Sequence, residues 1–136
     1  ERQLLQQIEA DAVSAEKVFA FFETEIGGRF KKAKQVLREE PFTLSLKDQE
    51  GDAQIIQGVI DCIFEDEQGN WVLLDYKTDY IEQYLLGDFE KIKQKMTKSY
   101  QIQLNYYQHA VQSIKRIQIS ERILYLYSIG QEVKID

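Results

Sequence analysis

The run Trp71–Lys77 constrains the fold most, because it is apolar on both faces and yet contains Asp75 and ends at Lys77. Such a run is typical of a strand buried on both sides, whose side chains alternate between two faces. Asp75 and Lys77 therefore point to the same face. A second apolar run, Gly58-Val-Ile-Asp61, contains another acid. Because unpaired buried charges are strongly unfavourable, a divalent cation is a natural partner for these acids.

A polar stretch over residues 66–70 separates the two runs and predicts a hairpin loop. In a symmetric loop the directly opposed pairs are Glu65 and Trp71, Ile63 and Leu73, Asp61 and Asp75, and Val59 and Lys77. Opposed residues have Cβ atoms about 4.5–5.5 Å apart. Two carboxylates that close repel unless a proton or a metal ion lies between them, so this register predicts a metal site. A bulge would shift the register by one residue, and a structural ion pair with Lys77 is the alternative interpretation.

The remaining pattern predicts an α/β domain with a mixed sheet. We expect helices over residues 1–10 and 14–24, the second capped by Ser14, and mixed structure over 29–37. Strands are predicted over 42–47, 54–65 and 71–78, with Pro41 marking the entry to the first strand. A helix near 88–95, a long helix over 97–117 and strands over 122–127 and 132–135 follow. Residues 80–87 are expected to form a loop at the rim of the site.

The long helix carries two polar residues, Gln103 and Tyr107, on or beside its apolar stripe. They lie one turn apart, so both point inward with polar ends that need partners. Taken alone, the pair is typical of an ordinary core aromatic residue with a neighbouring glutamine. Next to a strand with two charged residues, it indicates a pair that flanks the site.

Three motifs together resemble the RecB-type branch of the PD-(D/E)XK nucleases: Gly58-Val-Ile-Asp61, Asp75-Tyr-Lys77-Thr78 and Gln103-Leu-Asn-Tyr-Tyr107. Their order and spacing match, and the resemblance covers nearly the whole chain. It implies a restriction-endonuclease-like mixed β-sheet flanked by helices. The sequences of residues 40–42, 58–65 and 71–79 are especially similar to those of the C-terminal nuclease domains of bacterial ATP-dependent helicase–nucleases. Residues 1–136 are therefore expected to be a single nuclease domain, a C-terminal fragment of a longer protein.

The resemblance also implies roles for the site residues. It assigns Mg²⁺ (or Mn²⁺) binding to Asp61, Asp75 and the backbone carbonyl of Tyr76. Lys77 would orient or activate the attacking water or stabilise charge on the phosphate, and Gln103 and Tyr107 would support the site and the DNA strand. These nucleases also use a histidine ligand well upstream of the aspartates. The histidine of this chain, His109, lies downstream in the last helix.

Two functions follow as expectations. The first is metal-dependent DNA hydrolysis in double-strand-break repair and recombination, exonucleolytic on single strands delivered by a helicase; the expected partner is a second helicase–nuclease subunit. The second is a non-catalytic module that guides DNA or docks another subunit, and the missing histidine motivates it. A free-standing exonuclease of the same superfamily would carry clustered cysteines. The single Cys62 argues against that type and excludes an internal disulfide.

Composition limits these expectations further. The net charge of −6 argues against a general nucleic-acid binder. Basic residues do crowd two stretches, 29–38 and 91–98, either of which could meet phosphates or simply be solvated. The hydrophobic fraction of 43% supports one compact core, and no apolar run reaches the ~20 residues that span a membrane. A cytoplasmic location is expected.

Overall fold

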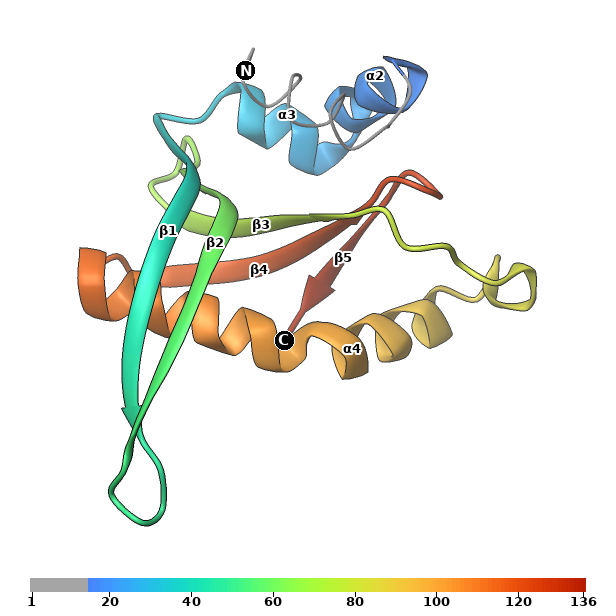
Figure 1. Ribbon diagram of the computed structural model, residues 1–136. Coiled ribbons are helices and arrows are strands. Elements are labelled where there is room, and N and C mark those ends of the chain that lie inside the picture. Colours follow the sequence, from blue (N-terminus) through green and yellow to red (C-terminus); the bar gives the residue numbers. More distant parts are fainter. Residues whose placement is uncertain (1–14) are drawn as a thin grey trace.

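The computed structural model describes residues 15–136 (Figure 1). The helix predicted over residues 1–10 and the cap at Ser14 lie outside the described residues. The elements are helices α2 (Ala15–Glu23) and α3 (Glu25–Lys31), strands β1 (Gln35–Lys47), β2 (Ala53–Glu65) and β3 (Trp71–Lys77), the 3-10 turn η1 (Gln83–Leu85), helix α4 (Phe89–Ala110), the π-helical turn η2 (Val111–Lys115), and strands β4 (Ile119–Leu126) and β5 (Gln131–Ile135). Within residues 15–136 the order of the predicted helices and strands is confirmed, except that the last two predicted helices form one.

One five-stranded sheet in the order β1-β2-β3-β4-β5 organises the chain. β3 and β4 run parallel and the other neighbouring pairs are antiparallel, which confirms the predicted mixed sheet. The parallel pair is possible because α4 supplies the crossover between its strands. Figure 1 shows α2 and α3 over one face of the sheet and α4 across the other. The molecule therefore has three layers, with one apolar core on each side of the sheet.

The two cores divide the side chains of the strands by face. The core under α2 and α3 contains Cys62, Phe64, Val72 and Leu74, with Tyr76 at its edge. The core under α4 contains Ile63 and Leu73 from the same two strands. Ile60 belongs to the α4 core, although it lies two residues from Cys62. The regular alternation of β2 side chains between the two faces of the sheet is therefore interrupted near Asp61.

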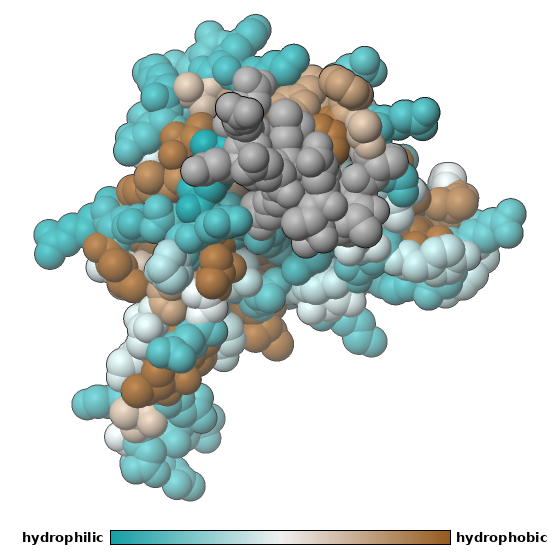
Figure 2. All heavy atoms as spheres, turned by 45° about the horizontal axis from the view of Figure 1, so that its top comes forward, coloured by the Kyte–Doolittle hydropathy of each residue, from teal (hydrophilic) through white to brown (hydrophobic). Residues whose placement is uncertain are grey.

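The β2–β3 hairpin has the predicted register. Glu65 pairs with Trp71 and Ile63 with Leu73, and Gly69 adopts the left-handed conformation in the loop (φ 87°). The ladder ends at the pair of Cys62 and Leu74, so neither the predicted pairing of Asp61 with Asp75 nor that of Val59 with Lys77 forms. Beyond that point β2 follows β1 away from β3, and these two strands form a hairpin that projects from the body (Figures 1 and 2).

The first strand starts earlier than predicted. β1 begins at Gln35 and passes through Pro41, which pairs with Val59. A proline lacks the N–H needed inside a sheet, but β1 is an edge strand, where that loss is tolerated. Helical structure within the mixed stretch 29–37 stops with α3 at Lys31, and the side chain of Thr24 caps the start of that helix by accepting the N–H of Gly27.

The two helices predicted over 88–95 and 97–117 form one continuous structure. Asp88 caps α4 by accepting the N–H of Lys91, and no breaker interrupts the chain before Ala110. The π-helical turn η2 follows and ends at Arg116, which is left-handed (φ 57°). No helix within residues 15–136 is long and apolar enough to cross a membrane.

Candidate active site

Asp61 and Asp75 converge where β2 and β3 separate, on the face covered by α4. Asp75 is 3% exposed, and Asp61 is half-buried. Burial, followed by the neighbouring carboxyl group of Asp75, raises the pKa of Asp61 to about 8. The carboxyl group of Asp75 thus acts on Asp61 although the two residues are not paired in the ladder, and near neutral pH Asp61 retains a proton that an exposed aspartic acid would release.

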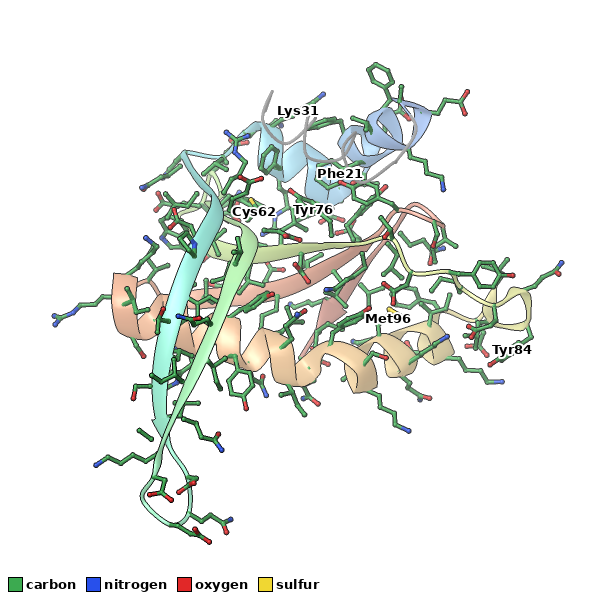
Figure 3. All side chains as sticks on the ribbon, in the orientation of Figure 1. Phe21, Lys31, Cys62, Tyr76, Tyr84 and Met96 are labelled. Carbon is green, nitrogen blue, oxygen red and sulfur yellow. The ribbon has the colours of Figure 1, made fainter. Side chains whose placement is uncertain are left out.

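The end of the β2–β3 ladder also defines the position of Tyr76. Its backbone N–H donates to Oδ2 of Asp61 over 2.9 Å. In a strand the N–H and C=O of one residue point to the same edge, so the carbonyl of Tyr76 also faces the gap beside Asp61. Its side chain points to the opposite face and packs against Phe21 of α2, with ring centroids 6.0 Å apart (Figure 3).

Lys77 is the cation of this cluster. Its Nζ lies 2.9 Å from Oδ2 of Asp75 and donates to Oε1 of Gln103 over 3.1 Å. The side chain of Lys77 is 17% exposed, so the ammonium group is largely shielded from water. Gln103 is therefore brought to the charged residues of β3, as the helix pattern predicted.

Tyr107 borders the site from α4. It is 9% exposed, and its ring packs edge-on against Phe42 of β1 with centroids 5.5 Å apart. Burial, followed by the negative charges of Asp75 and Asp61, raises the pKa of Tyr107 to about 12. The hydroxyl therefore stays protonated at physiological pH and can donate a hydrogen bond.

The contribution of Tyr100 to the site was not predicted from the sequence. The Nζ of Lys77 lies 4.2 Å from the centroid of the Tyr100 ring, in cation–π geometry. The Tyr100 hydroxyl donates to Oδ2 of Asp79 over 2.5 Å. The signal in the sequence was its position three residues before Gln103, which places both side chains on one face of the helix.

The donor set suits a magnesium-type ion. Oδ2 of Asp75 is buried and makes no hydrogen bond within residues 15–136, although it lies in ion-pair contact with Lys77. Two carboxylates and the carbonyl of Tyr76 are all hard oxygen donors, and Mg²⁺ is usually held by one or two carboxylates plus waters and substrate phosphates. Residues 15–136 contain no group of three His, Cys, Asp or Glu side chains that could hold a metal ion by themselves. His109 is exposed on α4.

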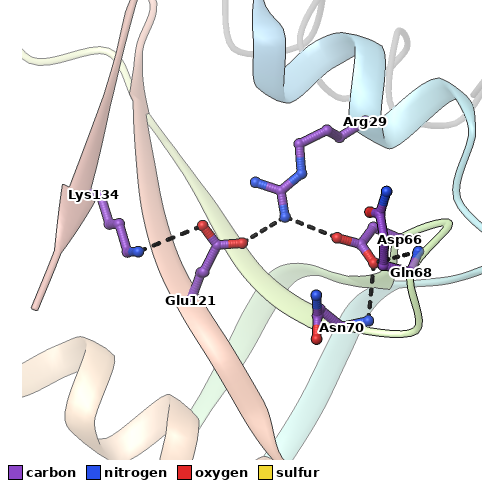
Figure 4. Close-up of polar contacts among 6 residues, drawn as sticks. All are labelled: Arg29, Asp66, Gln68, Asn70, Glu121 and Lys134. Atoms are coloured by element: carbon purple, nitrogen blue, oxygen red, sulfur yellow. Dashed lines mark hydrogen bonds and ion pairs between the residues drawn. The ribbon is translucent and has the colours of Figure 1, made fainter.

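Several cations of the two basic stretches are held in internal ion pairs. Arg29 donates to Asp66 over 3.0 Å and to Glu121 over 2.5 Å, and Lys134 lies 3.6 Å from Glu121 (Figure 4). In the second stretch, Lys95 lies 2.5 Å from Glu82. These pairs leave less positive charge for phosphates than the sequence alone indicates.

Comparison with known proteins gives a consistent result. Residues 2–133 match the PD-(D/E)XK nuclease superfamily. The A subunit of the ATP-dependent helicase/nuclease from Lysinibacillus sphaericus (strain C3-41) is 51% identical over 133 residues, which cover 98% of this chain and 11% of that protein. The protein of the same name from Heliobacterium modesticaldum (strain ATCC 51547 / Ice1) is 43% identical over 141 residues, covering 98% of this chain and 10% of that protein. The chain thus spans about a tenth of the length of these relatives.

Proposed function

Because this chain belongs to the PD-(D/E)XK nuclease superfamily, we propose that it hydrolyses DNA phosphodiester bonds with a divalent metal ion held at Asp61 and Asp75. The resemblance to RecB-type nucleases and the restriction-endonuclease-like fold class are confirmed. The narrower resemblance is to the nuclease domain of AddA (RexA in some bacteria), which belongs to the same type of helicase–nuclease. One observation carries the proposal: two acids and a lysine converge where β2 leaves β3.

Asp61, Asp75 and the backbone carbonyl of Tyr76 would hold Mg²⁺, or Mn²⁺ in its place. Such an ion lowers the pKa of a bound water and neutralises charge on the scissile phosphate. Lys77 supplies a fixed positive charge beside this position, which orients the attacking water or stabilises the negative charge that develops on the phosphate. Gln103 holds the ammonium group in place, and the hydroxyl of Tyr107 supports the site or the DNA strand.

The substrate we propose is single-stranded DNA from a duplex unwound by a helicase, cut exonucleolytically during the repair and recombination of double-strand breaks. The relatives' name, which combines helicase and nuclease, supports this setting. The net charge of −6 supports it too, because a domain to which a strand is delivered needs no broad basic surface of its own. The partner would be a second subunit of the AddB or RexB type, and the compartment would be the cytoplasm.

A second candidate function is a non-catalytic module that guides DNA or docks another subunit while keeping the nuclease fold. The absence of a third acidic or histidine side chain from the site, within residues 15–136, favours it. Titration calorimetry with Mg²⁺ and Mn²⁺ separates the two functions. Binding that is lost in the variant Asp61→Asn/Asp75→Asn supports the nuclease, and heat signals that are the same in that variant support the non-catalytic module.

The direct test is cleavage of a 5′-labelled single-stranded oligodeoxynucleotide in Mg²⁺, with and without chelator. Asp75→Asn should abolish cleavage, because it removes a ligand and preserves side-chain size. Asp52→Asn is the matched control, since Asp52 is exposed at the tip of the β1–β2 hairpin. Equal cleavage by the wild type and Asp75→Asn would refute the proposed site.

A further inference from the structure

Tyr100 makes two contacts that converge on the same strand end. Its ring lies against the ammonium group of Lys77, and its hydroxyl donates to Asp79, two residues farther along the chain. Asp79 is itself held from the other side, because Ser128 donates its hydroxyl to the Asp79 backbone carbonyl over 2.7 Å. One tyrosine of α4 thus touches both the lysine and the segment that leaves β3.

The surroundings of Lys77 show what the ring adds. Asp75 and Gln103 contact the ammonium group, at 2.9 and 3.1 Å. A lysine side chain has four rotatable bonds, and these two contacts alone leave the ammonium group free to swing toward solvent. The face of the Tyr100 ring, 4.2 Å away, occupies one side of the ammonium group and attracts its charge. The two contacts and the ring together restrict Nζ to one position beside Asp75.

We propose that Tyr100 is a positioning residue, whose ring holds the ammonium group of Lys77 against Asp75 and Gln103 and whose bond to Asp79 keeps that ring in place. The inference assigns no contact between Tyr100 and DNA. Its consequence for catalysis rests on the proposed function. Preorganisation of a charged group acts mainly on the chemical step, because the group then needs no rearrangement as charge develops.

The test compares Tyr100→Phe with Tyr100→Leu. Phenylalanine keeps the ring and loses the hydroxyl, whereas leucine keeps apolar bulk and loses the ring. We expect Tyr100→Leu to lower kcat about tenfold with KM within about twofold, and Tyr100→Phe to lower kcat less than about threefold. Tyr106→Leu, which removes another half-buried tyrosine of α4, is the matched control and should leave kcat unchanged.

A second readout reports the geometry without any cleavage. The ε-methylene protons of Lys77, assigned by their loss in Lys77→Arg, should resonate upfield in spectra of lysine-labelled protein because the ring current of Tyr100 shields them. The shift should persist in Tyr100→Phe and Tyr106→Leu and vanish in Tyr100→Leu. A Lys77 resonance at its ordinary position in the wild type would overturn the inference.

The two readouts separate the inference from the proposed function. If the wild type cleaves DNA, Asp75→Asn does not, and Tyr100→Leu cleaves at the wild-type rate, the positioning role is overturned and the nuclease stands. If the wild type and Asp75→Asn behave alike, the proposed function fails, and the ring-current shift alone decides whether Tyr100 holds Lys77.

Discussion

The backbone N–H of Tyr76 donates to Oδ2 of Asp61, and this side chain takes the place of a missing strand partner. The β2–β3 ladder ends at Cys62 and Leu74, and if it continued, Tyr76 would exchange backbone hydrogen bonds with Ile60. Ile60 pairs with Glu40 of β1 on its other side but has no partner in β3. The divergence of β2 from β3 therefore opens a gap in the sheet. The side chain of Asp61 and the backbone carbonyl of Tyr76 both face this gap. The same break in pairing creates the geometry that we propose for metal binding and explains why an acid is tolerated here.

The first prediction concerns pH and stability in the absence of divalent ions. Burial and Asp75 raise the pKa of Asp61 to about 8, whereas in the unfolded chain it has its ordinary value near 4. Between these values the folded state holds a proton that the unfolded state has released, so rising pH favours unfolding. We expect the free energy of unfolding to fall by at least about 1 kcal/mol between pH 5 and 8.

Urea titrations at several pH values measure this slope. Asp61→Asn should remove most of it, because asparagine does not ionise, and Asp52→Asn should leave it intact. A slope that is unchanged in Asp61→Asn would show that another group causes it.

The second prediction concerns the pair of Lys77 and Asp75. Replacing the lysine leaves a 3%-exposed carboxylate beside Asp61 without its cation. We expect Lys77→Met to lower the free energy of unfolding by about 2–3 kcal/mol. Because the cost arises from the acid left behind, adding Asp75→Asn should recover much of it.

A double-mutant cycle by chemical denaturation measures this coupling. The stabilities of Lys77→Met, Asp75→Asn and the double variant should deviate from additivity by about 1 kcal/mol or more. Additive effects would mean that the two side chains do not interact in solution, despite the 2.9 Å separation.

Which residues lie close together at the candidate site was easier to predict from the sequence than where the strands end. The register of the hairpin follows from loop length and from the period of two, both of which are local properties. The end of the ladder and the early start of β1 are not local. Pro41 signals a boundary in a central strand but is tolerated in an edge strand, and the place of β1 in the sheet depends on tertiary structure. The role of Tyr100 stayed hidden because helical spacing shows which residues share a face, and not which charge lies opposite.

The third prediction concerns the attachment of α3 to the sheet. Arg29 bridges Asp66 in the β2–β3 loop and Glu121 of β4 (Figure 4). Burial alone would raise the pKa of Asp66. The hydrogen bonds from the N–H of Asn70 and the guanidinium of Arg29 outweigh the effect of burial, so the pKa of Asp66 is lowered. Arg29→Ala should therefore destabilise the fold by about 1–3 kcal/mol, because it leaves a charged carboxylate of 4% exposure without its cation.

Lys32→Ala is the control for this variant. Lys32 lies 3.9 Å from Glu67, and both side chains are largely exposed, so its loss should change the stability by less than about 0.5 kcal/mol. Thermal melts at pH 7 compare the two variants. Equal melting temperatures for Arg29→Ala and Lys32→Ala would show that the network of Arg29 does not hold α3 in place.

The last prediction links a glycine of the first motif to the position of Tyr107. A Cβ at Gly58 would lie 2.9 Å from two ring carbons of Phe42, whose ring packs against Tyr107. Gly58→Ala should therefore displace the Phe42 ring, destabilise the fold by about 1–3 kcal/mol and reduce DNA cleavage through the movement of Tyr107.

Gly28→Ala is the control, since nothing lies within 4 Å of a Cβ at that helical position and alanine favours a helix. If the clash is the cause, adding Phe42→Leu to Gly58→Ala should restore part of the lost stability. A double variant no more stable than Gly58→Ala would assign the effect to the backbone of β2 instead.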